Sequence, residues 1–319
     1  MIYKWVKDLQ RALDTGNENI LADVPLVDLH CHGITSAPFS AFQKLSQDLP
    51  LPPKQFKNIK SFNLYLKQNI NPLIKDINTI RFLLRSAFQR LISEGVIYTE
   101  MSFDLTLPSF VDIPMEKYLE AISEERNRVS KKLKVCIEAG LDREIDPQKL
   151  FELLKQALKK NIISGLDLYG NEKAAPIKNF IGLYKLADKH NLKLKAHVGE
   201  SGSALDVKEA VEQLNLDAVQ HGIRAIDDLS VVEFLLKRGT ILNICPFSNL
   251  SLGLIKNLAS HPVRELFNAG VKITISSDDF SIFGKSVASE LISLYKENIF
   301  TKKEIKKIIE NGLAQISNV

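Results

Sequence analysis

The sequence predicts an α/β protein folded as a (β/α)8 TIM barrel, with a helical insertion after the first strand and an extra helix at the N-terminus. Short apolar runs alternate with longer segments of helical periodicity, a pattern that favours parallel βαβ units. Eight such runs occur, which is the number that a closed barrel needs. No glycine-rich dinucleotide turn follows the first run, and this disfavours a doubly wound sheet.

The predicted strands are four to nine residues long and lie between turn residues or helical segments. They cover residues 26–32, 95–103, 134–141, 162–168, 193–198, 218–221, 240–245 and 271–277. The predicted helices between them cover residues 114–132, 147–160, 177–190, 203–214, 228–237 and 286–298. Early prolines at Pro147 and Pro176 are typical of helix starts.

Two segments lie outside the regular alternation. Residues 33–94 contain the proline-rich turn 49–53 followed by helical patterns, and an insertion after strand 1 would lie at the C-terminal mouth of the barrel. At the N-terminus, a helix packed on the outside of the fold would have one apolar face made of Ile2, Trp5, Val6, Leu9 and Leu13. Because no linker or repeat interrupts the chain, we expect residues 1–319 to form one domain.

Composition limits the classes of partner. The 42 Lys and Arg residues are scattered among 38 Asp and Glu residues, without the basic cluster that a nucleic-acid groove usually has. The three cysteines form no CxxC pair, which favours a reducing compartment over a disulfide framework. Nothing resembles a signal peptide or a membrane span, so we expect a cytoplasmic protein that binds neither nucleic acid nor membranes.

Histidines and acidic residues gather at the ends of the predicted strands. His30 and His32 stand two apart at the end of strand 1, so their side chains point to the same face. His197 ends strand 5, His221 ends strand 6, and Asp278-Asp279 follow strand 8. In a barrel all these positions meet at one rim, and imidazoles with a carboxylate suit a zinc site that keeps a place for water. His190 and His261 are interpreted as ordinary surface or cap histidines.

Glu200 lies three residues after His197, where the chain has just left strand 5. A carboxyl there is close to a metal without having to bind it, which is the position of a general acid/base. Its alternative role is to place a negative charge at the N-terminus of the helix that begins near Ser203.

Six motifs in order resemble those of the adenosine/adenine deaminase family, from about Pro25 to Phe283. They are His30-Cys31-His32, Gly165-Leu166-Asp167-Leu168-Tyr169-Gly170-Asn171-Glu172, His197-Val198-Gly199-Glu200, His221-Gly222, Cys245-Pro246-Phe247-Ser248-Asn249 and Ser277-Asp278-Asp279. Each one falls at a strand end. The resemblance implies that a single Zn²⁺ is bound by His30, His32, His197 and Asp278.

The same resemblance implies roles for the neighbouring residues. Glu200 would protonate the purine ring nitrogen beside the attacked carbon and later deliver a proton to the departing ammonia. His221 would orient the attacking hydroxide and help take its proton, and Asp279 with the backbone of Gly170 would hold the other edge of the purine. The motif that begins at Cys245 is interpreted as a structural turn after strand 7, without a chemical role.

Three residues depart from the family pattern. Ile34 stands where adenosine deaminases have an aspartate that contacts the ribose and where adenine deaminases often have a glutamate. Ser102 replaces an arginine after strand 2, and Gln220 replaces a glycine before the strand 6 histidine. We therefore expect the chemistry to survive, and adenosine itself to be a weak substrate or to be bound through the 33–94 insertion. A modified adenine nucleoside or another aminopurine is the expected substrate.

Two alternatives to deamination of an adenine-type aminopurine remain at this stage. One is a mononuclear zinc amidohydrolase acting on an amide, lactone or phosphoester; strand 162–168 has no lysine of the kind that binuclear members carboxylate. The other is a catalytically silent relative that only binds a purine, for which Glu200 would be unnecessary. A cytidine-deaminase fold is excluded because the chain has no P-C-x-x-C motif. Imidazole sites accept several divalent metals, so the residues alone do not fix zinc.

Overall fold

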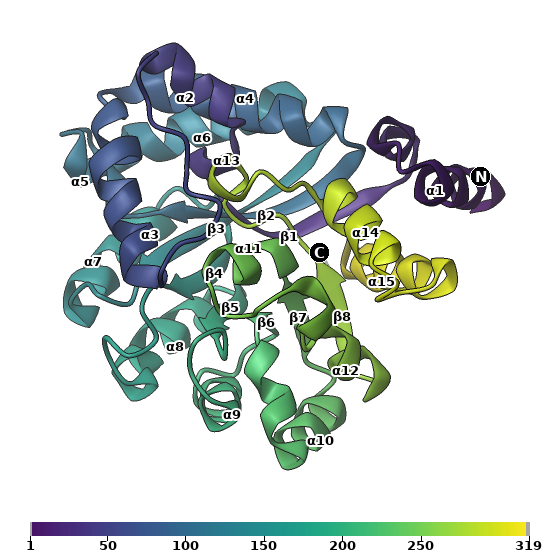
Figure 1. The fold of residues 1–319 in the computed structure, drawn as a ribbon. Helices are drawn as coiled ribbons and strands as arrows, with labels where there is room; N and C mark the ends of the chain where they lie inside the picture. Colours follow the sequence, from purple (N-terminus) through teal and green to yellow (C-terminus); the bar gives the residue numbers. More distant parts are fainter. Residues whose placement is uncertain (1, 317–319) are drawn as a thin grey trace.

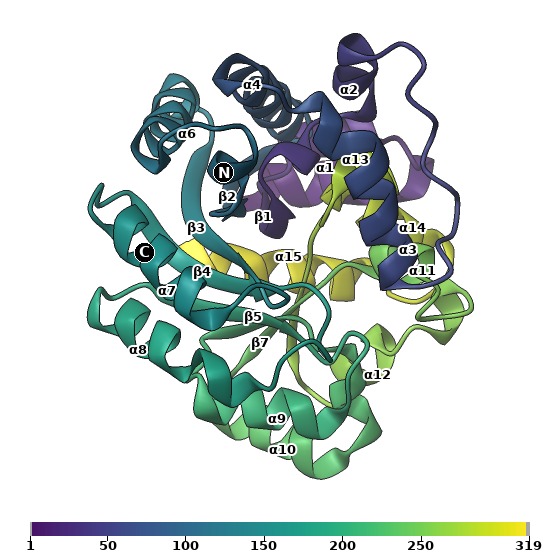
Figure 2. The ribbon, with the colours of Figure 1, turned by 90° about the vertical axis from the view of Figure 1, so that its left-hand side faces the viewer.

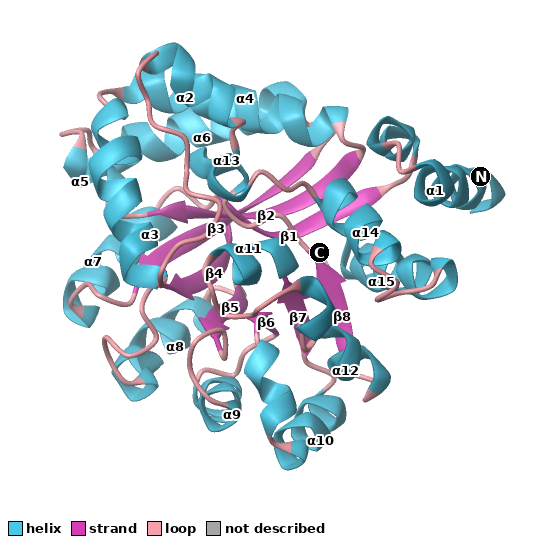
Figure 3. Cartoon of the chain, in the orientation of Figure 1, coloured by secondary structure: helices cyan, strands magenta, loops and turns pink. Residues whose placement is uncertain are grey.

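The computed structural model of the chain describes residues 2–316 and has the predicted (β/α)8 architecture (Figure 1). Eight strands pair in parallel in the order β1 to β8, with helices around the outside (Figure 3). The strands are β1 (Leu26–His32), β2 (Val96–Asp104), β3 (Lys134–Asp142), β4 (Ile163–Tyr169), β5 (Lys193–Val198), β6 (Ala218–His221), β7 (Ile241–Ile244) and β8 (Lys272–Ile275). Their positions confirm the fold that the alternating pattern predicts.

One helix after each strand belongs to the outer ring. These are α4 (Ile77–Ser93), α6 (Met115–Val129), α7 (Pro147–Leu158), α8 (Ile181–Lys189), α9 (Ala204–Gln213), α10 (Leu229–Arg238), α12 (Val263–Asn268) and α14 (Val287–Lys296). The shorter helices after the strands are α5 (Leu107–Phe110), α11 (Pro246–Ser251) and α13 (Phe280–Phe283). The predicted helix 177–190 is divided into a 3-10 turn, Ile177–Phe180, and α8.

The insertion after β1 lies at one side of the C-terminal mouth of the barrel. It contains α2 (Phe39–Leu45) and α3 (Ile59–Tyr65), while α4 packs beside α6 as a regular barrel helix. The ring of Phe62 stacks on that of Phe283 at 5.4 Å between centroids, and the N–H of Phe56 donates to the carbonyl of Ser251 at 2.6 Å. Figure 2 shows α3 beside α11 and α13, the two short helices that follow β7 and β8. The segment therefore forms one wall of the barrel mouth.

The opposite end of the barrel is closed by α15 (Lys302–Ile316), which packs on β1 and β8 (Figure 2). Leu313 packs against Val27, Leu29 and Tyr98. Above this layer the buried Lys195 ammonium lies 3.0 Å from Glu100 Oε2 and 2.7 Å from Glu138 Oε1. These layers leave the C-terminal mouth as the open end of the barrel.

The N-terminal helix α1 (Ile2–Thr15) packs on the outside against α14 and α15. Leu9 and Leu13 are buried, and Trp5 packs against the core, as the apolar face predicts. None of the described helices combines the length and the apolar character needed to cross a membrane.

The barrel closes between β8 and β1 through hydrogen bonds that Ser276, Ser277 and Asp278 make with β1. The N–H of Asp278 donates to the carbonyl of His30 at 2.9 Å. The N–H and hydroxyl of Ser277 donate to the buried Asp28 carboxylate at 3.2 and 2.5 Å, and the Ser276 hydroxyl accepts the N–H of Leu29 at 3.2 Å. Side chains therefore replace part of the backbone ladder along this seam.

Candidate active site and metal centre

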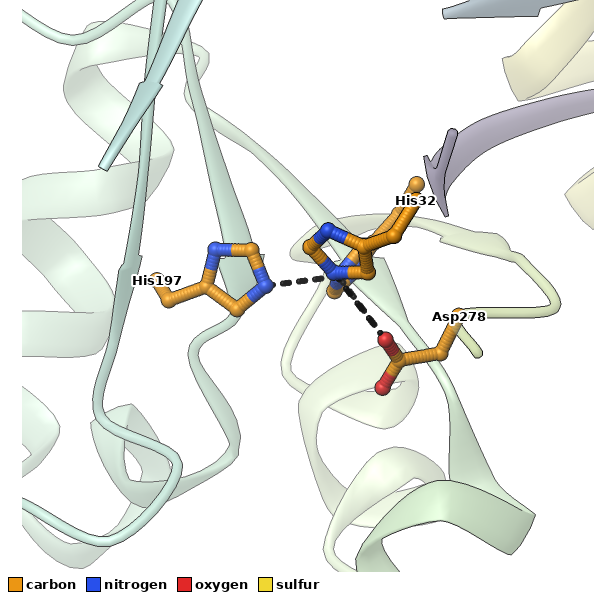
Figure 4. A group of neighbouring side chains, drawn as sticks. His32, His197 and Asp278 are labelled. Carbon is orange, nitrogen blue, oxygen red and sulfur yellow. Dashed lines mark hydrogen bonds and ion pairs between the residues drawn. The ribbon is translucent and has the colours of Figure 1, made fainter. Parts of the chain in front are cut away.

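Four predicted ligands converge at the C-terminal mouth, and Figure 4 labels three of them, His32, His197 and Asp278. His30 and His32 come from the end of β1, His197 comes from β5, and Asp278 lies just beyond β8. One donor atom from each lies within 4.8 Å of the others. His32 Nε2 is 3.2 Å from Asp278 Oδ1, and His30 Nε2 is 2.9 Å from His197 Nε2. The strand ends thus bring together residues that are as far apart as 30 and 278 in the sequence.

The partners of His30 and His197 indicate which nitrogen of each ring carries hydrogen. His30 Nδ1 is 3.3 Å from the carbonyl oxygen of Asn243, which can only accept, and His197 Nδ1 is 3.1 Å from Asp167 Oδ1. With hydrogen on both Nδ1 atoms, the two Nε2 atoms present lone pairs to each other at 2.9 Å. Two acceptors at that distance need a cation between them, so the donor set fits a bound metal ion.

The electrostatics of the cluster also favour a cation. Burial opposes a charge on Asp278, but the surrounding imidazoles outweigh it and hold the pKa of this carboxyl well below its usual range. Burial likewise opposes protonation of His32, but Asp279 and Asp278 raise its pKa to about 10. Three carboxylates, with Asp167 as the third, therefore surround the imidazoles and compensate the charge of a bound cation.

Cys245 lies beside the cluster without the properties of a ligand. With His30 and His221 it forms a second group whose donor atoms lie within 4.8 Å of one another. However, burial and the nearby Asp278 raise the pKa of its thiol well above the usual value, and a metal ligand has to be a thiolate. Its Sγ is 3.4 Å from His30 Nδ1, so it acts as a hydrogen-bond partner that helps to orient that ring.

Glu200 projects from the loop after β5 and is only 7% exposed. Its Oε1 lies 3.4 Å from His221 Nε2. Burial, followed by the charges of Asp278 and Glu172, raises the pKa of the Glu200 carboxyl well above its usual value. A carboxyl that keeps its proton near neutral pH can act as a general acid.

The loop that carries Glu200 is fixed by a residue of another loop. The Glu172 carboxylate accepts the backbone N–H groups of Gly199 (2.7 Å), Glu200 (3.1 Å), Ser201 (2.7 Å) and Gly202 (3.0 Å). Gly199 has φ +69°, and a Cβ there would lie 2.2 Å from a methyl carbon of Val207. Glycine and the buried hydrogen bonds therefore define the path of the chain at Glu200.

Two site residues have left-handed backbone conformations. His221 has φ +61° and Asp278 has φ +56°, which are uncommon for residues other than glycine. His221 ends β6 and Asp278 lies a short way beyond the end of β8, where each side chain turns toward the ligand cluster. Strain of roughly 1 kcal/mol or more at such positions is typical of functional sites.

The predicted substrate contacts lie on the rim beside the cluster. Asp279 is 8% exposed, and the Thr35 hydroxyl donates to its Oδ1. Gly170 follows β4 with φ +96°, and a Cβ there would lie 2.6 Å from Asp142 Oδ1. Ile34 begins a short 3-10 turn and packs half-buried against the core. The position that carries an acid in the family thus carries an apolar side chain in this chain.

Three residues that contact the site had no predicted role there. Asn249, on α11, is fully buried and contacts both Glu200 and His221. His261 is 2% exposed and contacts Asn249, so its assignment as a surface residue was wrong, although it does cap the start of α12. Glu172 is the last residue of the motif that begins at Gly165, and the sequence predicts no role for it. The sequence does contain a signal for each residue: the Ser248-Asn249 pair for Asn249, the His261-Pro262 pair for His261, and the motif that begins at Gly165 for Glu172.

The comparisons with known proteins identify the family of the chain. The family model described as adenosine deaminase matches residues 40–317. The adenine deaminase of Wolinella succinogenes is 27% identical over 308 residues, covering 92% of this chain and 93% of the relative. Among solved structures, the adenine deaminase of Arthrobacter aurescens is 25% identical with a TM-score of 0.84, over 91% of this chain and 93% of that one.

A second solved structure extends the similarity of fold. It is an amidohydrolase from Burkhoderia ambifaria, described with bound Zn, with 20% identity and a TM-score of 0.82 over 96% of this chain and 87% of that one. The family match spans most of the chain, and the relatives with adenine deaminase activity in their names align over nearly their full length. The chain therefore belongs to the adenosine deaminase family of hydrolytic deaminases.

Proposed function

We propose that this enzyme removes the amino group of a small-molecule adenine-type aminopurine by zinc-dependent hydrolysis, releasing ammonia and leaving a 6-oxopurine. The observation that carries the proposal is the position of the Glu200 carboxyl, buried beside the ligand cluster and 3.4 Å from His221. The names of the adenine deaminases that this chain resembles support the same reaction. Family membership favours it over other zinc hydrolysis and over a silent binding protein.

One Zn²⁺ per chain would be held by His30, His32, His197 and Asp278. Three imidazoles and one carboxylate are a donor set that zinc accepts, and the zinc in the Burkhoderia ambifaria structure supports this choice of metal. When bound, zinc would supply a hydroxide nucleophile at neutral pH, because it lowers the pKa of water to about 7.

Glu200 would carry the protons of the reaction. Attack on the aromatic carbon places negative charge on the ring, and a proton from the Glu200 carboxyl to the adjacent ring nitrogen neutralises that charge. The same carboxyl later delivers a proton to the departing ammonia. Its raised pKa supports the first step, since the group must be protonated when the substrate binds.

His221, Asp279 and Gly170 would position the reactants. The His221 ring would orient the attacking hydroxide, since its Nε2 faces both Glu200 and Asp278 at 3.4 and 3.8 Å. Asp279 and the backbone of Gly170 would bind the other edge of the purine. Burial and Asp278 raise the pKa of Asp279 to about 6 against the opposing charge of His32, so near-neutral pH allows it to donate or to accept.

The apolar side chain of Ile34 favours a substrate that does not need a carboxylate to bind a ribose hydroxyl. An isoleucine can neither accept nor donate a hydrogen bond, and a polar group buried without a partner costs roughly 1–3 kcal/mol. We therefore propose a modified adenine nucleoside or another aminopurine as the preferred substrate, with adenosine a weaker one.

The test is ammonia release by the zinc-loaded protein from adenine, adenosine, 5′-modified adenosines and other aminopurines. Glu200→Gln should retain zinc and lose roughly 10²–10⁴-fold in kcat. The matched control is Glu212→Gln, at an exposed carboxylate of α9, which should leave the rate unchanged. Absence of ammonia from every compound, with zinc bound, would overturn the proposed function.

A further inference from the structure

The Asn249 side chain lies between the two groups proposed to act on the substrate. Its Nδ2 is 2.8 Å from Glu200 Oε1 and 3.2 Å from His221 Nδ1. Its Oδ1 is 3.1 Å from His261 Nε2. All four side chains are buried: Glu200 follows β5, His221 ends β6, and Asn249 and His261 both lie in the connection between β7 and β8. Asn249 therefore joins groups that the sequence keeps 21 to 61 residues apart.

The backbone determines the direction of these hydrogen bonds. The N–H of Val263 donates to His261 Nδ1 at 2.9 Å, and a backbone amide can only donate. His261 Nδ1 is therefore the acceptor nitrogen, and the single ring hydrogen lies on Nε2. That hydrogen is donated to Asn249 Oδ1, which fixes the amide with its oxygen toward His261 and its NH₂ group toward the reaction site.

The fixed amide then sets the hydrogens of both neighbours. Of its two N–H groups, one is donated to Glu200 Oε1 and the other to His221 Nδ1. A neutral His221 whose Nδ1 accepts carries its hydrogen on Nε2, the nitrogen that faces Glu200 and Asp278. Because Glu200 Oε1 is an acceptor, the proton of that carboxyl lies on Oε2.

We propose that Asn249, oriented by His261, is a positioning residue that directs the Glu200 proton to Oε2 and holds His221 with hydrogen on Nε2. This inference rests on the roles proposed above for Glu200 and His221. It removes the role of proton acceptor that the family resemblance implies for His221. A nitrogen that already carries hydrogen donates to the attacking oxygen and takes no proton from it.

Glu200 then carries every proton transfer. Its carboxyl gives a proton to the ring nitrogen, takes the proton of the added hydroxyl group, and passes that proton to the amine as the carbon–nitrogen bond breaks. It regains a proton from the next water, so the cycle closes without His221 changing its protonation.

The first test reads the tautomers without any measurement of activity. Zinc-loaded protein labelled with ¹⁵N-histidine should show His221 and His261 with hydrogen on Nε2, the two signals being assigned by their loss in His221→Gln and His261→Gln. Asn249→Asp replaces the donor with an acceptor, and we expect it to move the hydrogen of His221 to Nδ1. Hydrogen on Nδ1 of His221 in the unaltered protein would overturn the inference.

The second test separates positioning from a structural role. Asn249→Ala should lower kcat by roughly 10²-fold with KM changed less than about threefold, because the substrate contacts are untouched. At position 261, Gln can still donate to Asn249, so His261→Gln should retain more of kcat than His261→Ala. The matched control is Asn311→Ala, a half-buried asparagine on α15 whose amide donates to the carbonyl of Ile273 at 3.1 Å.

The outcomes distinguish this inference from the proposed function. If no aminopurine is deaminated while both tautomers are found as expected, the proposed function fails and the hydrogen-bond relay stands. If the protein is an active deaminase and Asn249→Ala keeps its full kcat, the positioning role is overturned and the proposed function stands.

Discussion

Glu172 binds the backbone of Glu200, the proposed acid of the reaction, at 3.1 Å. Three neighbouring N–H groups donate to the same carboxylate, so one side chain holds the whole turn. We expect Glu172→Gln, which has a single acceptor oxygen, to lower the unfolding free energy by roughly 1–3 kcal/mol and kcat by about tenfold or more. Chemical denaturation and steady-state kinetics measure the two effects. Unchanged kcat would show that the turn holds its shape without this carboxylate.

Ile34 should determine how strongly the enzyme depends on the ribose. In the unaltered protein, adenosine and 5′-deoxyadenosine should have similar kcat/KM values, since no carboxylate is available at this position to bind the 5′-hydroxyl. Ile34→Asp should raise the preference for adenosine by roughly 10-fold, the value of one hydrogen bond to a charged group of about 1.4 kcal/mol or more. Ile34→Val is the matched control and should leave the ratio unchanged. A strong dependence on the 5′-hydroxyl before any substitution would contradict the expectation.

Removal of metal should weaken the fold as well as stop the reaction. A ligand that binds only the folded state at about 1,000 times its Kd stabilises that state by about 4 kcal/mol. We therefore expect a lower Tm after chelation and its recovery with zinc, measured by calorimetry. His197→Ala should lose this response, whereas His190→Ala, at an exposed histidine, should keep it. Equal Tm values with and without bound zinc would count against ligation by these residues.

Glu290, which is not one of the proposed metal ligands, predicts a pH dependence of stability. Its Oε1 accepts the N–H of Phe247 at 2.8 Å, its Oε2 is buried without a partner among the described residues, and burial raises its pKa from 4.5 to about 8. Above pH 4.5 the unfolded chain loses this proton while the folded chain keeps it to about pH 8, so the stability contributed by this group falls as pH rises through that window.

The variant Glu290→Gln should remove this loss. Gln can still accept from Phe247, and it does not ionise. Between about pH 5 and about pH 8 we expect the unaltered protein to lose roughly 1–3 kcal/mol more stability than the variant, since one pKa unit corresponds to about 1.4 kcal/mol. Denaturation at a series of pH values measures the difference, with Glu297→Gln, at the exposed C-cap of the same helix, as control. Parallel pH curves would show that Glu290 is ionised in the folded protein.

The sequence predicted the barrel and the convergence of the ligands because both follow from local patterns. Strand periodicity places His30 and His32 on one face, and a parallel barrel carries the ends of all strands to one rim. The last strand is shorter than expected, ending at Ile275, because the chain leaves the ladder to reach the left-handed conformation of Asp278.

The residues that orient the site could not be predicted in this way. The role of Asn249 depends on the distance of its amide from Glu200 and on the tautomer of His261, and neither leaves a periodic signal. The His261-Pro262 pair predicts a surface or cap histidine; His261 does cap the start of α12, but tertiary packing buries it. Hydrogen-bond direction requires coordinates, since it follows from which backbone groups are within reach.

The seam between β8 and β1 has a consequence for how the enzyme is made. His30 is synthesised well before Asp278, and the N–H of Asp278 reaches the carbonyl of His30 only when β8 has docked on β1. A growing chain therefore holds an incomplete set of proposed ligands, with three histidines and no carboxylate from β8. A chain that stops before β8 would therefore lack one of the four proposed ligands, and we expect it to bind the metal less tightly than the complete barrel.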